Sequence, residues 1–243
     1  MSEIRWPSYS QGDVFSQRIR EQWTERLGRR LDVLVAGCGG GTEIDMGRVA
    51  ARLTGVDEDL PALRARTEAR ADLHAWSLGD LRSVPLPHRS FDVIRCEFLL
   101  ERIRHTELVL DRLSSALRPG GLMFLRLRDR GSAYGFCSRV LPRRARRLLW
   151  PRFAPAGEVG PLPAVYEPIV SREGVQSYCL MRGLMIAEEY VGVSGPAHRG
   201  RFGPLVGGMC KLIEKASRGQ LPAAHDEVTL VVRKPQNHFA RII

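Results

Sequence analysis

The segment from Leu31 to Ile44 constrains the fold more than any other part of this 243-residue chain. Its apolar run, from Val33 to Gly37, is typical of a strand that is buried on both faces. A glycine cluster at 37–41 follows directly, and we expect a helix behind it, from Glu43 to Leu53. A strand, a glycine turn and a helix in this order open a nucleotide-binding α/β unit, in which the helix N-terminus offers free N–H groups.

The glycine spacing indicates which nucleotide such a unit takes. The dinucleotide fingerprint requires a third glycine three places after the second. Starting from Gly37 and Gly39, that place holds Thr42, and starting from Gly39 and Gly41 it holds Ile44. Neither frame completes the fingerprint, which argues against an NAD-dependent oxidoreductase and leaves that class as a rival. The cluster taken alone is equally consistent with an ordinary turn after a strand.

Further motifs follow at regular intervals. Asp57 ends a second apolar strand, and a carboxylate at a strand end can accept both hydroxyls of a ribose. Asp80 follows a third strand, the segment 86–96 gives a fourth, and a Pro-Gly-Gly turn at 119–121 leads into a fifth. Together these elements, over roughly residues 30 to 130, closely resemble the class I S-adenosylmethionine-dependent methyltransferases, of the type that includes the ubiquinone-biosynthesis enzymes.

The resemblance implies a cofactor, S-adenosylmethionine, a product, S-adenosylhomocysteine, and a set of residues that hold them. Asp57 would bind the ribose, Asp80 would contact the adenine amino group, and Leu81 would flank the ring. The implied reaction is methyl transfer to a small-molecule acceptor, and we expect O-methylation of a secondary metabolite or of an amphiphilic, quinone- or lipid-like compound. The full set of implied cofactor-binding residues is Ala36, Gly37, Cys38, Gly39, Gly41, Asp57, Glu58, Gly79, Asp80, Leu81 and Cys96.

Two departures from the family pattern bear on catalysis. Val35 stands where relatives carry an acidic residue that positions the methionine amino group. After the fourth strand, Arg102, Arg104 and His105 replace a histidine, a proline and an aspartate of the relatives. His105 is then the nearest candidate general base, although a surface position at a helix start is the favoured interpretation. These departures keep open a catalytically silent, methyltransferase-like binding protein that acts through its arginine-rich segment.

We predict one α/β domain over residues 1–243, with a seven-stranded, mostly parallel, doubly wound sheet, an antiparallel C-terminal strand and helical lid insertions. It divides into an N-terminal helical cover (1–30), the cofactor-binding core (31–128), a basic lid (129–170) and a C-terminal helix and β-hairpin with an insert (171–243). The cover contains a helix from Asp13, as N-cap, to Leu27, preceded by Trp6 and Tyr9, which either touch substrate or belong to a tail.

The C-terminal part carries the last two strands, at 184–194 and 226–234, and about thirty residues separate them. A helix within 204–214 would complete the acceptor pocket or form a homodimer contact. His198 and His225, at the margins of this insert, are weaker candidates for a general base.

The net charge of +10 is concentrated in one window. Residues 126–152 hold nine arginines, at 126, 128, 130, 139, 143, 144, 146, 147 and 152, against a single acid, Asp129. We interpret the window as a lid with a role in substrate binding, then as a peripheral contact with anionic membrane, then as a pocket for an acidic acceptor; nucleic acid is the least favoured partner. Five scattered cysteines, without metal-ligand spacing, predict a cytoplasmic protein with no structural metal.

Overall fold

The structure is a computed structural model that describes residues 11–154 and 159–236. Trp6 and Tyr9 therefore lie outside the described residues. The elements are α1 (Gln11–Glu25), β1 (Leu31–Ala36), β2 (Ala51–Asp57), α2 (Pro61–Glu68), β3 (Ala75–Leu78), β4 (Phe91–Glu97), α3 (Thr106–Ala116), β5 (Leu117–Arg128), α4 (Ala133–Val140), α5 (Arg143–Phe153), α6 (Arg172–Met181), β6 (Met185–Gly192), α7 (Pro196–Arg199), α8 (Gly203–Ala216) and β7 (Glu227–Arg233).

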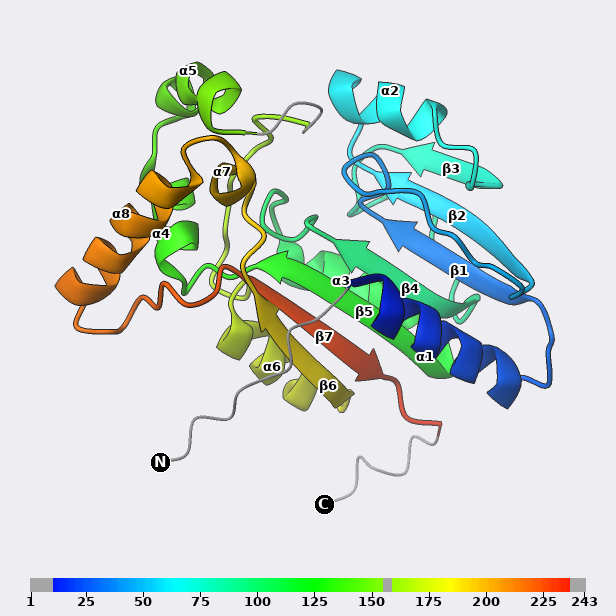
Figure 1. The fold of residues 1–243 in the computed structure, drawn as a ribbon. Coiled ribbons are helices and arrows are strands. Elements are labelled where there is room, and N and C mark those ends of the chain that lie inside the picture. The colour runs from blue at the N-terminus through cyan, green and yellow to red at the C-terminus, as the bar shows by residue number, and fades with distance from the viewer. Residues whose placement is uncertain (1–10, 155–158, 237–243) are drawn as a thin grey trace.

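The seven strands form one sheet in the order β3-β2-β1-β4-β5-β7-β6 (Figure 1). Strands β1 to β5 pair in parallel, and β7 runs antiparallel to both β5 and β6. This confirms the predicted mostly parallel sheet with an antiparallel C-terminal strand. The strand order reverses between β1 and β4, and ligands of open α/β sheets bind at such a reversal, beyond the carboxyl ends of the strands.

Both faces of the sheet are buried, as the apolar run in β1 predicts. Leu34 and Ala36 face a layer that contains α3 and α6, whereas Val33 and Val35 face α1 and the connection from β1 to β2. On the second face, the rings of Phe15 and Phe124 pack edge to face, with 4.9 Å between their centroids. Alternate residues of one strand therefore stabilise both layers, because successive side chains of a strand point to opposite faces.

The helix predicted from Glu43 to Leu53 is wrong. Residues 42–50 form an irregular connection, in which the Asp45 carboxylate accepts a hydrogen bond from the Gly47 N–H at 2.8 Å and Gly47 takes a left-handed φ of 54°. The connection must return along β1, a distance of about 20 Å for six residues of strand. As a helix, residues 42–50 would span only about 13 Å, which is too short.

One predicted helix start also needs correction. Helix α1 begins at Gln11, so Asp13 lies within it and is not its N-cap. Leu60 precedes α2 without a side-chain cap, and the Asp59 carboxylate pairs with the Arg64 guanidinium. Gly28, with φ of 71°, follows the end of α1.

Four helices gather at the end of the sheet to which the parallel strands point (Figure 1). They are α4 and α5, from the arginine-rich window, and α7 and α8, from the insert between β6 and β7. We call these four helices the lid. The helix predicted within 204–214 is part of α8. Among the described residues, no helix is both long enough and apolar enough to cross a bilayer.

Candidate active site

The glycine loop after β1 uses its own N–H groups. Those of Gly37 and Cys38 donate to the Val56 carbonyl, those of Gly40 and Gly41 donate to the Gly37 carbonyl, and that of Gly39 donates to the Asp57 carboxylate. Glycine is required here for packing, since a Cβ on Gly39 would lie 2.5 Å from the Leu63 carbonyl oxygen of α2. The loop therefore holds the carboxyl ends of β1 and β2 against α2.

Asp57, the predicted ribose ligand, is fully buried and engaged on both oxygens. Oδ2 accepts the Gly39 N–H at 2.8 Å, and Oδ1 accepts the Glu58 N–H at 2.7 Å and a short hydrogen bond from Nη2 of Arg102. Arg102 is equally buried, with 2% of its side chain exposed. A ribose can therefore reach Asp57 only when Arg102 moves.

A cleft of about 890 Å³ opens beyond the ends of β2 and β3, and it contains several predicted cofactor ligands. Glu58, Gly79, Asp80 and Leu81 line it, together with Arg102 and His105. Its volume lies in the range of small-molecule and cofactor sites. Ala36, Gly37, Cys38, Gly39, Gly41, Asp57 and Cys96, the other predicted ligands, do not line this cleft.

The two acids of the cleft differ in availability. Both carboxylate oxygens of Asp80 accept hydrogen bonds from Arg82, which lower the pKa of Asp80 to about 2. Oε2 of Glu58 is buried and has no hydrogen-bond partner among the described residues, and burial raises the pKa of this group. Oε2 of Glu58 lies 4.0 Å from Nε of Arg102, an ion pair without a hydrogen bond, so it can still accept a hydrogen bond from a ribose hydroxyl.

A second cavity, of about 160 Å³, lies between the strand ends and the lid. Arg102 lines both cavities, and its Nε and Nη1 have no hydrogen-bond partner in the described chain. Gly40 of the glycine loop reaches the small cavity, whose other walls include Phe98, Glu101, Arg128, Tyr134, Trp150 and Tyr166. Arg102 thus separates a polar cleft from an aromatic cavity.

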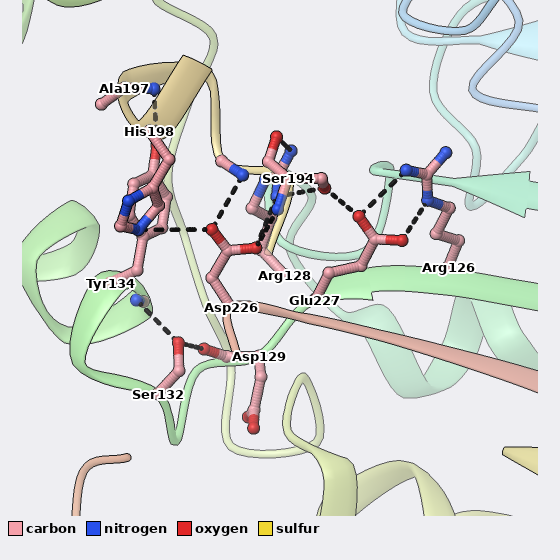
Figure 2. Close-up of polar contacts among 12 residues, drawn as sticks. Arg126, Arg128, Asp129, Ser132, Tyr134, Ser194, Ala197, His198, Asp226 and Glu227 are labelled. Atoms are coloured by element: carbon pink, nitrogen blue, oxygen red, sulfur yellow. Dashed lines mark hydrogen bonds and ion pairs between the residues drawn. The ribbon is translucent and has the colours of Figure 1, made fainter. Parts of the chain in front are cut away.

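A buried ionic network attaches the lid to β5 and β7 (Figure 2). The Asp226 carboxylate accepts hydrogen bonds from Arg128 and from the N–H groups of Ser194 and Gly195, and it lies 3.6 Å from Nε2 of His198. Next to it, Nε of Arg126 pairs with Oε1 of Glu227 at 2.5 Å. Two arginines that sequence reasoning assigned to the basic window therefore belong to the buried network.

The three histidines that the sequence singles out lie apart. His105 precedes α3 with a left-handed φ of 57°, is exposed, and lines the large cleft. His198 packs against the Tyr134 ring, with 5.0 Å between centroids, and His225 contacts the Asp129 carboxylate at 3.1 Å. None of the three lines the small cavity.

Comparison with known proteins identifies the family. A family model described as a methyltransferase domain matches residues 34–125, the segment that forms β1 to β5 and the glycine loop. Over that segment the chain is a methyltransferase domain of the class I, type 11 kind. The resemblance drawn from the glycine spacing and the strand-end acids is thereby confirmed, and S-adenosylmethionine is the cofactor of this family.

Three curated relatives match about half of this chain or less. A malonyl-[acyl-carrier protein] O-methyltransferase of Xylella fastidiosa is 29% identical over 49% of this chain and 44% of its own length. A ubiquinone/menaquinone biosynthesis C-methyltransferase of Methylococcus capsulatus is 31% identical over 46% and 52%. A ubiquinone biosynthesis O-methyltransferase of Cupriavidus pinatubonensis is 32% identical over 38% and 39%. The chain spans about half the length of these relatives or less.

Solved structures share the fold across most of the chain. An S-adenosylmethionine-dependent methyltransferase from Mesorhizobium loti aligns over 90% of this chain and 96% of its own, with a TM-score of 0.53 and 17% identity. The cyclase SpnF aligns over 91% and 81%, with a TM-score of 0.50 and 17% identity. At this identity the likeness concerns the fold alone, and the fold also carries chemistry other than methyl transfer.

Polar groups of the kind that an adenosyl cofactor requires lie at the cleft, and the sequence predicted only some of them. Glu58 was predicted, but Arg102 was noted only as a replacement for a histidine. Their unpartnered, buried polar atoms, Oε2 of Glu58 and Nε and Nη1 of Arg102, lie at the junction of the two cavities. Such atoms are costly unless a ligand or water completes them. The sequence signal that could have identified Arg102 as a site residue was the replacement of the relatives' histidine by an arginine.

Proposed function

We propose that this chain transfers the methyl group of S-adenosylmethionine to a small-molecule acceptor. The observation that carries the proposal is the arrangement of two adjoining cavities at the carboxyl ends of the strands, with Arg102 between them. The large cleft would hold the adenosine, and the small cavity would hold the acceptor beneath the lid. The bound cofactor supplies an electrophilic methyl group, so the protein contributes mainly alignment of the acceptor with it.

Each cofactor group has a complementary residue at the cleft. The ribose hydroxyls would donate to Oε2 of Glu58, and to Asp57 once Arg102 is displaced from it. The methionine carboxylate would accept hydrogen bonds from Nε and Nη1 of Arg102, because a guanidinium matches a carboxylate in charge and geometry. Recognition through the carboxylate is consistent with Val35, which cannot bind the amino group as an acid would. Asp80 and Leu81 remain the predicted adenine contacts.

Calorimetric titration of the chain with S-adenosylmethionine, S-adenosylhomocysteine and NAD tests the cofactor. We expect binding of the two adenosyl compounds and none of NAD. Absence of adenosyl binding, or tight binding of NAD, would overturn the proposal. Turnover is measured with a panel of small-molecule acceptors that bear hydroxyl, thiol or amine groups, and adenosyl binding without turnover on any of them would favour the silent binding protein.

The variant Arg102→Gln tests the assigned carboxylate contact. We expect S-adenosylhomocysteine to bind about tenfold more weakly or worse, since a charged hydrogen bond is lost. The affinity of 5′-methylthioadenosine, which lacks the amino-acid carboxylate, should not fall. The matched control is Arg30→Gln, which changes an exposed arginine outside both cavities. An equal loss for both ligands would contradict the assignment.

The relatives are ubiquinone-biosynthesis enzymes and an acyl-carrier-protein methyltransferase, which supports an acceptor of the quinone or acyl-carrier kind. O-methylation is the finer proposal, because two of the three relatives are O-methyltransferases and the small cavity contains a carboxylate that can accept a proton. The acceptor panel above therefore includes phenols beside thiols and amines. Transfer to carbon alone would refute the O-methyl assignment and leave the methyltransferase proposal standing.

A second candidate role, contact with an anionic membrane, rests on the outer surface of the lid. No side chain of α5 is buried, and Arg143, Arg144 and Arg147 are exposed beside Leu148. Helix α8 exposes Leu205, Met209 and Leu212, which recur at helical spacing next to Lys211 and Lys215. Basic and apolar side chains combined on surface helices are suited to the membrane interface. The chain would then act in the cytoplasm at a membrane surface.

A further inference from the structure

The small cavity contains a buried carboxylate of which one oxygen has no hydrogen-bond partner among the described residues. Glu101 lies in the turn after β4 and is 7% exposed. Its Oε2 is buried without a hydrogen-bond partner among the described residues, and the residue lines the small cavity. A buried acceptor without a donor weakens a fold, so its presence at a cavity indicates that a ligand supplies the donor.

Four aromatic side chains and three arginines line this cavity together with Glu101. The aromatic residues are Phe98, Tyr134, Trp150 and Tyr166, from the turn after β4, from α4, from α5 and from the segment before α6. A volume of about 160 Å³ corresponds to one ring, because an apolar cavity of about 150 Å³ accommodates benzene. The cavity therefore suits a single aromatic ring that carries a polar hydrogen directed at Glu101.

The backbone around the cavity is held in unusual conformations. Phe98 and Tyr166 both have a φ of 48°, in the left-handed region that side chains disfavour. The N–H groups of Val165 and Tyr166 donate to the Glu101 carbonyl at 2.8 and 3.1 Å. These hydrogen bonds hold Tyr166 against the turn after β4. The Phe98 ring lies between two guanidiniums, with Cζ of Arg126 and of Arg128 4.4 and 4.3 Å from its centroid. Strain of this kind is typical of functional sites.

Glu101 is able to exchange a proton near neutral pH. Burial raises its pKa to about 7, against the opposing effects of backbone hydrogen bonds and of the positive charges of Arg128 and Arg102. Titratable and charged side chains from several elements face Glu101 or share its cavity. They are Cys96 of β4, Arg102 of the turn after β4, Arg128 of β5, Tyr134 and Arg146 of the lid, and Tyr166 of the segment before α6. Arg128 forms its ion pair with Asp226. Its positive charge favours the Glu101 carboxylate without an ion pair between the two residues.

We propose that the small cavity binds a phenolic ring and that Glu101 accepts the proton of its hydroxyl during methyl transfer. This inference rests on the proposed function. The hydroxyl proton passes to the Glu101 carboxylate, and a lone pair of the oxygen forms the new bond to the methyl carbon. The bond from that carbon to sulfur breaks with its electron pair remaining on sulfur, which leaves an aryl methyl ether and a neutral thioether. Glu101 is thus a catalytic residue, in a different cavity from His105.

The test uses 4-fluorophenol, with fluorobenzene as the matched probe that lacks the hydroxyl. Their binding to the chain in the presence of S-adenosylhomocysteine is followed by fluorine NMR. We expect 4-fluorophenol to bind more tightly than fluorobenzene above pH 7, and this preference to fall as Glu101 is protonated below pH 7. The probe itself stays protonated in this range, as phenols ionise near pH 10.

The variant Glu101→Gln should weaken 4-fluorophenol binding about tenfold or more and abolish the pH dependence, while fluorobenzene binding does not change. Glu173→Gln, an exposed carboxylate on α6, is the control that should leave both unchanged. Equal binding of the two probes by the unmodified chain would overturn the inference, and so would loss of the pH dependence in His105→Gln but not in Glu101→Gln. Calorimetry with S-adenosylhomocysteine alone scores the proposed function separately, because Glu101 lies outside the large cleft.

Discussion

The sheet and the lid are stabilised by different interactions. Leu34, Ile94 and Leu125 are fully buried at the centre of the sheet, in a layer of aliphatic side chains. The lid has a much smaller apolar cluster, of Ala133, Val206 and Cys210, and joins the sheet through Arg128 and Asp226. Apolar burial is cooperative and non-directional, whereas a buried ion pair repays its desolvation only in one geometry.

The difference implies two levels of stability in one molecule. The sheet should open only on global unfolding, and the lid should open locally when its ionic network is disturbed. The large cleft and the small cavity lie where these two regions meet, so a lid that opens by itself gives an acceptor access without loss of the cofactor site. The predictions below test this contrast, beginning with the largest effect.

The largest effect is expected at the charge pair of Asp57 and Arg102, which is buried on both sides at the end of β2. Asp57→Ala leaves the Arg102 guanidinium buried without a partner and frees the Gly39 N–H. We expect a loss of about 3–5 kcal/mol in the free energy of unfolding, measured by urea denaturation. Changing Arg102 to Leu in the same chain should recover part of the loss, because no charge is then stranded. A double variant as unstable as Asp57→Ala would contradict this account.

The second prediction concerns the network of Figure 2. Asp226→Ala removes the acceptor for Arg128, Ser194 and Gly195. Each hydrogen bond to a charged group contributes about 1.5–3 kcal/mol, so opening of the lid should become at least tenfold more frequent. Hydrogen exchange should rise in α4, α7 and α8 while β1 to β4 stay protected. Faster exchange throughout the sheet would show that lid and sheet unfold as one unit.

These two networks also mark the limit of what the sequence predicts. Strands β1 to β5 follow from apolar runs that end in glycine or an acid, because local periodicity determines them. The pairing of Arg102 with Asp57 joins residues 45 positions apart, and no periodic pattern reports such a contact. Arg126 and Arg128 counted as surface charge in the sequence, since their partners Glu227 and Asp226 arrive only with β7.

The connection between β1 and β2 shows a different limit. Ile44, Met46 and Val49 lie in the segment predicted as a helix, yet Ile44 and Val49 are buried from an irregular loop, with Met46 packed against them. A helix over residues 42–50 would be shorter than the distance along β1 that the connection has to cover. This comparison could have been made from the sequence once the strand ends were known. The small cavity, by contrast, combines residues from Gly40 to Pro196, and no local pattern in the sequence reports that they share a cavity.

The third prediction concerns pH and the lid. Burial lowers the pKa of His198 below the ordinary value of 6.5, which means that the closed lid favours the neutral ring. The open lid binds the proton more readily, so stability of the closed lid should be lost as pH falls through and below 6.5, by less than about 1.4 kcal/mol per pH unit. Hydrogen exchange of α7 and α8, corrected for intrinsic rates, measures this loss. His198→Asn should remove it, whereas His88→Asn, an exposed histidine outside the lid, should not.

The smallest effect on stability is expected on the outer surface of α5. Changing Arg143, Arg144 and Arg147 together to Gln should alter the free energy of unfolding by no more than about 0.5 kcal/mol per site, because these side chains are exposed. The same change should markedly reduce flotation of the chain with vesicles that contain phosphatidylserine, since each basic residue near an anionic surface contributes about 1 kcal/mol. Neutral phosphatidylcholine vesicles are the control. The membrane contact would be rejected if both vesicle types retained the chain equally, or if the triple variant were retained as well as the unmodified chain. The exposed arginines would then be left to bind an acidic acceptor.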